Sequence, residues 1–234
     1  FGFAEPGVTN WLRSLYSRTD ALIAPSQSMV DTLREQDMHD DISIWSRGVD
    51  REIFNAGQRD IAWRSKIGLT ETDVAIVFLG RLVMEKGLDV FTDTITELTK
   101  RGVAHKVLLV GDGPEREWLE KRLEGASFAG FQSGADLGRA VACMDVLFNP
   151  SVTETFGNVT LEAMACGVPV VAAQATGSES LVSCGSNGRL IAPSDITGFA
   201  DALQAYCESA ELRATHGAAG STRADDFEWD AINQ

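Results

Sequence analysis

Short apolar runs alternate with amphipathic segments along most of this chain, and this alternation restricts the possible folds more than any other feature. Val74–Leu79 (VAIVFL) is continuously apolar, which is typical of a strand buried on both faces. The segment after it places apolar residues at helical spacing and ends at Arg101-Gly102. Further strands are expected at Val107–Val110, Val146–Asn149, Val168–Ala173 and Arg189–Ile191. The pattern predicts an α/β fold with a parallel sheet covered by helices on both faces, in which Val74–Leu79 and Val107–Val110 are neighbours.

The first part of the chain behaves differently. Ala21–Ala24 and Ile42–Trp45 are expected to be strands, and Ser26 is a suitable N-cap for a helix that continues to Leu33. Four parts are therefore predicted: the end of an N-terminal domain (1–46), a link without clear periodicity (47–60), the main domain (61–225) and the start of a terminal segment (226–234). The sequence begins without an initiator Met or a basic leader, so we expect it to come from the middle of a longer chain.

The formal net charge of −14 argues against a nucleic-acid partner, since most of the surface would repel phosphates. Any anion site must then be local, made of a few cations and helix N-termini. No apolar stretch approaches the length of a membrane span. The cysteines lack zinc-site spacing and are expected to be reduced packing groups in a cytoplasmic protein without a metal site, and the three histidines are expected in surface or loop positions.

The segment Pro150–Val171 (PSVTETFGNVTLEAMACGVPVV) carries the strongest functional signal. A strand ends before it, a loop contains Glu154, and a helix begins near Gly157-Asn158. Ligands of parallel sheets bind at this carboxyl edge of the strands. The free N–H groups of Gly157, Asn158 and Val159 would favour a phosphate, and Gly157 has no side chain to obstruct it.

Two glutamates flank that helix start. Glu162 lies roughly 6 Å further along the helix axis than Asn158, on the same face, where a carboxylate can accept hydrogen bonds from both ribose hydroxyls. Glu154 can reach the group on the other side of the phosphates, which is the sugar in a sugar nucleotide. The alternative is that both glutamates are solvated charges.

Two other loops follow strands. Gly80-Arg81-Leu82-Val83-Met84-Glu85-Lys86-Gly87 supplies Arg81 and Lys86, the local cations that a diphosphate would require in so acidic a chain. Gly111-Asp112-Gly113-Pro114 is not a G-x-G-x-x-G fingerprint, because Arg116 occupies the position of the last glycine. It is interpreted equally well as a structural turn or as the wall of a pocket.

These motifs resemble those of retaining GT-B glycosyltransferases, glycosyltransferase family 4 in particular. Glu154 and Glu162 match the family's Glu-x7-Glu pair, and the residues around them match its Phe-Gly and Leu-Glu-Ala-Met-Ala elements. The Arg81–Lys86 loop is similar to a Gly-Arg-Leu…Lys-Gly element that grips the donor diphosphate. The resemblance implies a Rossmann-like donor domain of GT-B type with a truncated N-terminal domain. It assigns catalysis to Glu154, Arg81 and Lys86, and donor binding to Glu162, Phe156, Gly157, Asn158, Val159, Gly80, Gly111 and Gly113.

The resemblance further implies transfer of a hexosyl group from a nucleoside-diphosphate sugar to an acceptor hydroxyl, with retention and without a metal. GDP-mannose is the first expectation for the donor and a UDP-hexose the second, while the acceptor is a glycan, a lipid or a small molecule. The chain alone is expected to be inactive, and a cytoplasmic enzyme of this kind can touch the inner membrane face through its N-terminal domain. The alternatives are a non-catalytic nucleotide-sugar-binding module, a GT-B epimerase or phosphorylase, and a purely structural α/β domain.

Overall fold

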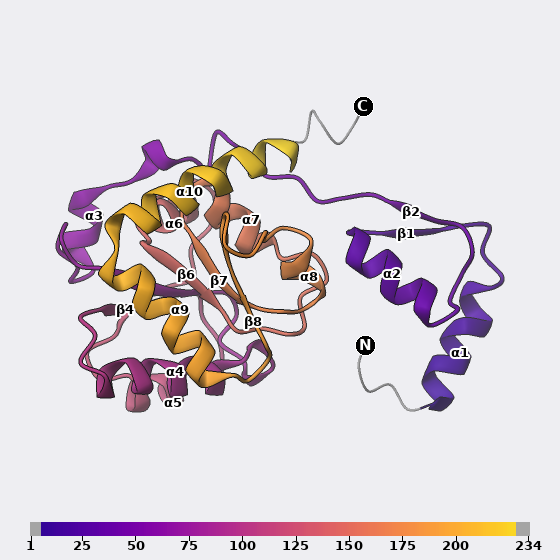
Figure 1. Ribbon diagram of the computed structural model, residues 1–234, viewed down its shortest axis with the longest axis horizontal. Coiled ribbons are helices and arrows are strands. Elements are labelled where there is room, and N and C mark those ends of the chain that lie inside the picture. Colours follow the sequence, from indigo (N-terminus) through magenta and orange to yellow (C-terminus); the bar gives the residue numbers. More distant parts are fainter. Residues whose placement is uncertain (1–5, 228–234) are drawn as a thin grey trace.

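The computed structural model describes residues 6–227, which form a small and a large body joined by one extended segment (Figure 1). In the small body, β1 (Leu22–Ala24) and β2 (Ile42–Ile44) pair in parallel, accompanied by α1 (Pro6–Tyr16) and α2 (Gln27–Glu35). Ser26 caps α2, since its hydroxyl accepts a hydrogen bond from the Met29 N–H. Both predicted strands and the predicted cap are confirmed.

The large body contains one parallel sheet of six strands in the order β5-β4-β3-β6-β7-β8. The strands are β3 (Ala75–Leu79), β4 (Lys106–Val110), β5 (Ser127–Gly130), β6 (Val146–Asn149), β7 (Val170–Ala173) and β8 (Gly188–Ile191). Strand β3 pairs in parallel with β4, with Ala75 opposite Lys106 and Leu79 opposite Val110, so the expected neighbourhood is confirmed. The apolar run reflects burial on both faces, because Ile76 and Val77 are fully buried.

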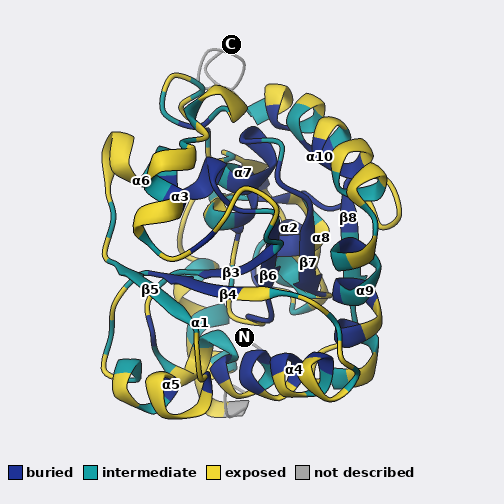
Figure 2. Ribbon diagram, turned by 90° about the vertical axis from the view of Figure 1, so that its left-hand side faces the viewer, coloured by how far each residue is buried: buried dark blue, intermediate teal, exposed yellow. Residues whose placement is uncertain are grey.

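Helices cover both faces of the sheet and expose their outer sides (Figure 2). Helices α4, α5 and α9 pack on one face around Phe91, Leu119 and Phe199, whereas α6 and α7 pack on the other around Val141 and Leu161. The helices of the large body are α3 (Ile61–Lys66), α4 (Leu88–Lys100), α5 (Arg116–Arg122), α6 (Gly134–Ala142), α7 (Asn158–Ala165), α8 (Thr176–Glu179), α9 (Ile196–Glu208) and α10 (Ala210–Ala224). Short 3-10 turns span Ala56–Gln58, Met84–Lys86 and Asp225–Phe227.

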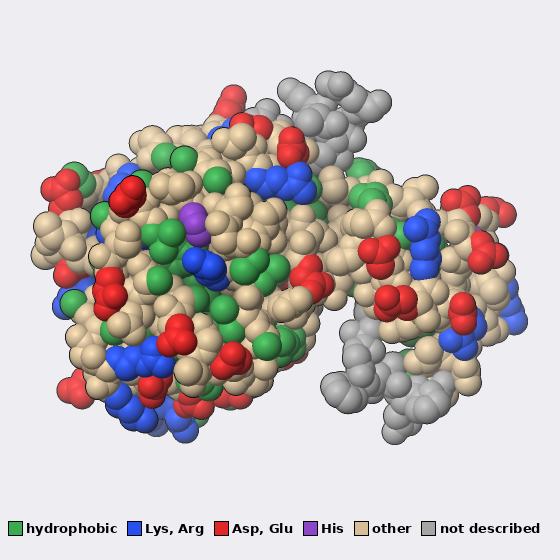
Figure 3. All heavy atoms as spheres, viewed as in Figure 1, with side chains coloured by type: hydrophobic (Ala, Val, Ile, Leu, Met, Phe, Trp, Pro, Cys, Tyr) green, Lys and Arg blue, Asp and Glu red, His purple; other side chains and the backbone are tan. Residues whose placement is uncertain are grey.

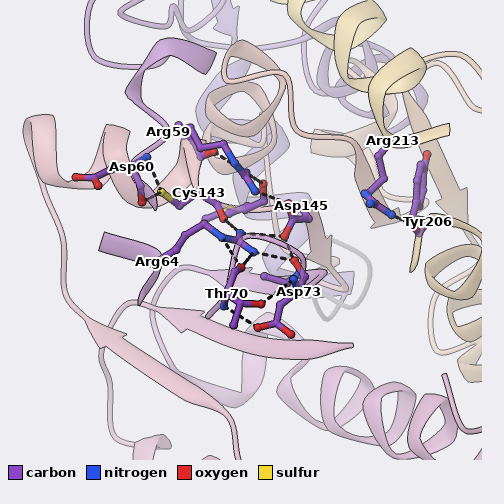
Figure 4. Close-up of polar contacts among 12 residues, drawn as sticks. Arg59, Asp60, Arg64, Thr70, Asp73, Cys143, Asp145, Tyr206 and Arg213 are labelled. Carbon is purple, nitrogen blue, oxygen red and sulfur yellow. Dashed lines mark hydrogen bonds and ion pairs between the residues drawn. The ribbon is translucent and has the colours of Figure 1, made fainter. Parts of the chain in front are cut away.

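A fully buried arginine ties α3 to the amino edge of this sheet (Figure 4). The Arg64 guanidinium forms an ion pair with Asp145 at 3.0 Å and donates hydrogen bonds to the carbonyls of Thr70, Asp73 and Cys143. The same Asp145 oxygen, Oδ2, also accepts a hydrogen bond from the Ala75 N–H at 2.8 Å, and its other oxygen, Oδ1, forms an ion pair with Arg59 at 2.8 Å. The cluster therefore joins the segments that lead into β3 and β6, the two central strands.

The expectation that the histidines lie at surface or loop positions is wrong for His216, which is only 5% exposed. Its Nδ1 lies 2.7 Å from the Tyr206 hydroxyl, which explains how the polar ring is accommodated between α9 and α10. All four cysteines are free. Within residues 6–227, no helix is both long and apolar enough to cross a bilayer. The predicted segment 226–234 lies largely outside the described residues.

Candidate functional site

The strand order creates a crevice between β3 and β6. The chain runs outward from β3 through β4 to β5 and then returns to the other side of β3 to form β6, so the loops after β3 and β6 diverge at their carboxyl ends. These two loops enclose a cavity of about 280 Å³. Its walls also include a residue of the link between the bodies, and the lining comprises Arg47, Phe78, Leu79, Gly80, Lys86, Asn149, Glu154, Thr155, Phe156, Gly157, Asn158 and Val159.

An ion pair crosses this cavity. Lys86 Nζ lies 2.7 Å from Glu154 Oε1, and the side chains are 19% and 20% exposed. Lys86 and Glu154, the two residues that the resemblance assigns to catalysis on different loops, thus meet in one cavity. The pair brings a cation that can bind phosphate next to a carboxylate that can accept hydrogen bonds from hydroxyl groups.

The start of α7 supplies backbone donors to the same cavity. Gly157 precedes the helix in a left-handed conformation (φ 91°), and no side chain caps the helix. Within residues 6–227, the N–H groups of Gly157, Asn158 and Val159 donate no hydrogen bond. A helix start with free N–H groups and a positive dipole end favours an anion.

Glycines allow the backbones that carry Lys86 and Glu154 to approach their neighbours. A Cβ on Gly177 would lie 2.7 Å from the Glu154 Cβ, and the Gly177 N–H donates to the Glu154 carbonyl at 3.0 Å. A Cβ on Gly87, whose φ is +74°, would lie 2.9 Å from the Pro150 carbonyl oxygen. The position of both charged side chains therefore depends on close backbone contacts between loops.

Three of the predicted site residues line neither this cavity nor the smaller one that adjoins it. Arg81 is 72% exposed and pairs with Glu85 at 3.0 Å, so it does not converge with Lys86 and Glu154 in this geometry. Gly111 and Gly113 pack against the backbone of the Arg81 loop. A Cβ on Gly111 would lie 1.9 Å from the Gly80 carbonyl oxygen, and a Cβ on Gly113 would lie 2.4 Å from the Leu82 carbonyl oxygen. Their observed contacts are those of a tight turn that supports the Arg81 loop.

Glu162 lines an adjoining cavity of about 200 Å³ that shares Asn158 with the first. Gly48, Val49 and Asp50, which belong to the link between the bodies, also line it. Burial raises the pKa of Glu162 to about 7, because the charged form loses hydration there. A ligand hydroxyl pair that donates to this carboxylate would offset the lost hydration and favour ionisation.

The raised pKa of Glu162 predicts a pH dependence of stability. The unfolded chain releases this proton near the ordinary value of 4.5, whereas the folded protein holds it to about 7. Between these values the folded state binds more protons, so the contribution present at low pH is lost as the pH rises, by no more than about 3 kcal/mol. Glu162→Gln should therefore gain stability relative to the wild type between pH 5 and 8. Thermal midpoints across that range check this, and parallel curves for the two proteins would contradict it.

Arg47 is the cation of the first cavity's lining that was not expected at the site, because it belongs to the predicted link 47–60. Its side chain lines the first cavity together with Lys86 and Glu154. Arg47 belongs to none of the motifs in which a loop joins a strand to a helix. The sequence shows only that it is a cation three residues before Asp50. The larger groove of about 630 Å³ at the amino edge of β4 and β5 contains none of the predicted site residues. Among residues 6–227, no group of three or more His, Cys, Asp or Glu is placed to hold a metal ion.

Two family models cover most of the chain. The model described as Glycosyl transferases group 1 matches residues 73–209, and the model described as Glycosyltransferase Family 4 matches residues 2–53. A GDP-mannose-dependent alpha-mannosyltransferase of Corynebacterium glutamicum is 32% identical over 198 residues, covering 85% of this chain and 46% of that protein. A sulfoquinovosyl transferase of Arabidopsis thaliana is 32% identical over 228 residues, covering 94% of this chain and 44% of that protein.

Solved structures share the fold at lower identity. A sucrose-phosphate synthase from Thermosynechococcus elongatus superposes with a TM-score of 0.84 at 23% identity, covering 99% of this chain and 60% of that one. Anabaena HepE in complex with UDP-glucose gives a TM-score of 0.85 at 24% identity, covering 99% and 66%. The chain spans about half the length of the curated relatives it matches. Since the group 1 model covers 137 of 234 residues by its bounds, the chain belongs to the group 1 glycosyl transferases and has the GT-B fold.

Proposed function

We propose that this chain is the donor-binding half of a glycosyltransferase that moves a hexosyl group from a nucleoside-diphosphate sugar to an acceptor hydroxyl, with retention of the anomeric configuration. The observation that carries the proposal is the cavity in which Lys86, Glu154 and the uncapped start of α7 meet. It combines a phosphate site and a hydroxyl acceptor within one crevice at the carboxyl edge of a parallel sheet.

The proposed roles follow the order of groups in a sugar nucleotide. Glu162 accepts hydrogen bonds from the ribose hydroxyls in its own cavity, and Asn158 lines both that cavity and the first. The diphosphate lies against the N–H groups of Gly157, Asn158 and Val159, with Lys86 beside it, and Arg81 joins it by exchanging Glu85 for phosphate. Glu154 then holds the hexose. The cations stabilise the departing diphosphate without a metal, and a phosphate oxygen takes the proton of the acceptor hydroxyl.

The first proposal for the donor is GDP-mannose, with a UDP-hexose second. Three of the relatives carry names of GDP-mannose-dependent alpha-mannosyltransferases, while others are D-inositol 3-phosphate glycosyltransferases. The Anabaena neighbour was solved with UDP-glucose, which supports the second proposal. The acceptor is a glycan, lipid or small molecule held by residues outside this chain.

This chain should bind nucleoside diphosphates but should not transfer a hexosyl group. Calorimetry with GDP and UDP, with and without Mg²⁺, should show binding that does not depend on the metal, because Lys86 and the α7 N-terminus face the phosphates directly. Residues 1–234 should show no transfer from GDP-mannose or UDP-glucose to water-soluble acceptors. Binding only with Mg²⁺ would contradict the metal-free mechanism, and failure to bind any nucleoside diphosphate would contradict the proposed function. Binding without transfer by a longer form of the protein would favour the non-catalytic module.

A further inference from the structure

The cations at and near the first cavity differ in whether they already form an ion pair. Lys86 pairs with Glu154 at 2.7 Å, and the neighbouring Arg81 pairs with Glu85 at 3.0 Å. Arg47 also lines the cavity, and within residues 6–227 its guanidinium has no hydrogen bond or ion pair. A lysine shared with a carboxylate contributes little net positive charge to the space between them. Arg47 is therefore the cation of this lining whose charge is available to an entering anion.

We propose that Arg47 binds the diphosphate of the donor from the segment between the two bodies, opposite the start of α7. The assignment rests on the proposed function and adds a phosphate ligand outside the loops that follow β3 and β6. A diphosphate carries more than one negative charge, and a guanidinium can bind two of its oxygens at once. The α7 N–H groups contact one side of the phosphates, and Arg47 contacts the other.

The residues that follow Arg47 support this placement independently. Gly48, Val49 and Asp50 line the cavity that contains Glu162, whereas Arg47 lines the cavity that contains Lys86. The segment thus passes the two cavities in the same order in which a nucleotide presents phosphate and ribose. Its course is fixed by the Val49 N–H, which donates to the Phe227 carbonyl at 2.9 Å. Acidic and basic side chains are interspersed on the face drawn in Figure 3, and the chain has a formal net charge of −14, so an available cation at this cavity is a local feature.

Titrations of GDP and UDP into wild-type residues 1–234, Arg47→Ala, Arg47→Lys and Lys86→Ala test the inference. Arg47→Ala should weaken both diphosphates about tenfold, as expected for the loss of one charge-assisted contact. Arg47→Lys should lose less, because charge remains while the two-pronged contact is lost. Guanosine and uridine, which lack phosphate, should bind the wild type and Arg47→Ala equally. Arg18→Ala is the matched control, since Arg18 is exposed in the small body and lines neither cavity.

The outcomes separate this inference from the proposed function. Loss of diphosphate affinity in Lys86→Ala but not in Arg47→Ala would overturn the role of Arg47 and leave the proposed function standing. An equal loss for nucleosides and diphosphates in Arg47→Ala would also overturn it, because the segment would then act through its fold. If the wild type binds neither GDP nor UDP, both proposals fail. Unchanged thermal midpoints in all variants show that each comparison is made on folded protein.

Discussion

Glu154→Gln should lower hexosyl transfer by about a hundredfold or more in the longer protein that we expect to contain this chain, while leaving GDP and UDP binding nearly unchanged. The carboxylate is proposed to hold the sugar, and the loss of one group oriented toward the transition state has effects of this size. Free diphosphate lacks the sugar. The variant also releases Lys86 from its 2.7 Å ion pair, so any small change in GDP or UDP affinity should be a gain and not a loss.

Glu162→Gln should have the opposite profile. The ribose is present in free GDP and UDP as well as in the sugar nucleotides, so both kinds of ligand should bind more weakly, by ~1 to 3 kcal/mol. Glu117→Gln on the exposed surface of α5 is the matched control and should behave as the wild type. Calorimetry with GDP and GDP-mannose, and with UDP and UDP-glucose, measures the two profiles.

Two results would contradict the assignment of these glutamates. Equal losses on all ligands in both variants would mean that the motif acts through folding or general charge. Normal binding in both variants and normal transfer in Glu154→Gln would return the two residues to the solvated-surface interpretation.

The sheet could be predicted from the sequence because its strands are buried on both faces. A strand such as β3 has almost no polar positions, and the helix after it has Leu88, Phe91, Ile95 and Leu98 on one buried face. A continuous apolar run and an apolar residue at every third or fourth position differ enough to be recognised from a short stretch of sequence. The loops after β3 and β6 could be placed together because parallel strands expose their carboxyl ends at one edge.

What could not be predicted depends on contacts between distant segments. Arg47 reaches the cavity only because the segment between the bodies runs past α7, and no local pattern describes that course. The cavity that contains Glu162, whose pKa is raised by burial, is likewise lined in part by residues 48–50, more than a hundred positions earlier. His216 has a polar partner across a helix pair, and such a pairing is invisible in the periodicity of either helix.

The orientation of the Arg81 side chain could not be predicted from the sequence for a different reason. The sequence places it on the correct loop, but Glu85 is four residues away within the same short turn and captures the guanidinium. An exposed pair of this kind is worth less than about 1 kcal/mol, so a diphosphate could exchange for Glu85 without a large penalty. Local sequence therefore identifies the loop, whereas the choice between two partners for Arg81 depends on the ligand.

Arg64→Met should lower the free energy of unfolding by about 3 to 5 kcal/mol, the range for breaking a buried ion pair by removing one partner. The guanidinium is fully buried, and its removal leaves the Asp145 carboxylate, whose side chain is 12% exposed, with Arg59 as its remaining ion-pair partner, together with three carbonyls that lose a donor. Arg64→Lys should retain part of the stability, because the positive charge remains. It should lose the rest, because an ammonium cannot reach all of these acceptors at once. Urea unfolding of the 234-residue chain gives the comparison.

The matched control is the exposed i,i+4 pair between Arg116 and Glu120, whose side chains are 37% and 45% exposed. Arg116→Met should change the free energy of unfolding by less than about 1 kcal/mol, since water replaces the lost contact. A second comparison separates the ion pair from packing. The double variant Arg64→Met with Asp145→Asn loses the 3.0 Å pair only once, so it should lose less than the sum of the two single losses. Additive losses would show that Arg64 stabilises the fold through its other contacts and not through the pair with Asp145, and a loss below about 1 kcal/mol in Arg64→Met would mean that the amino edge of β3 and β6 does not depend on this cluster.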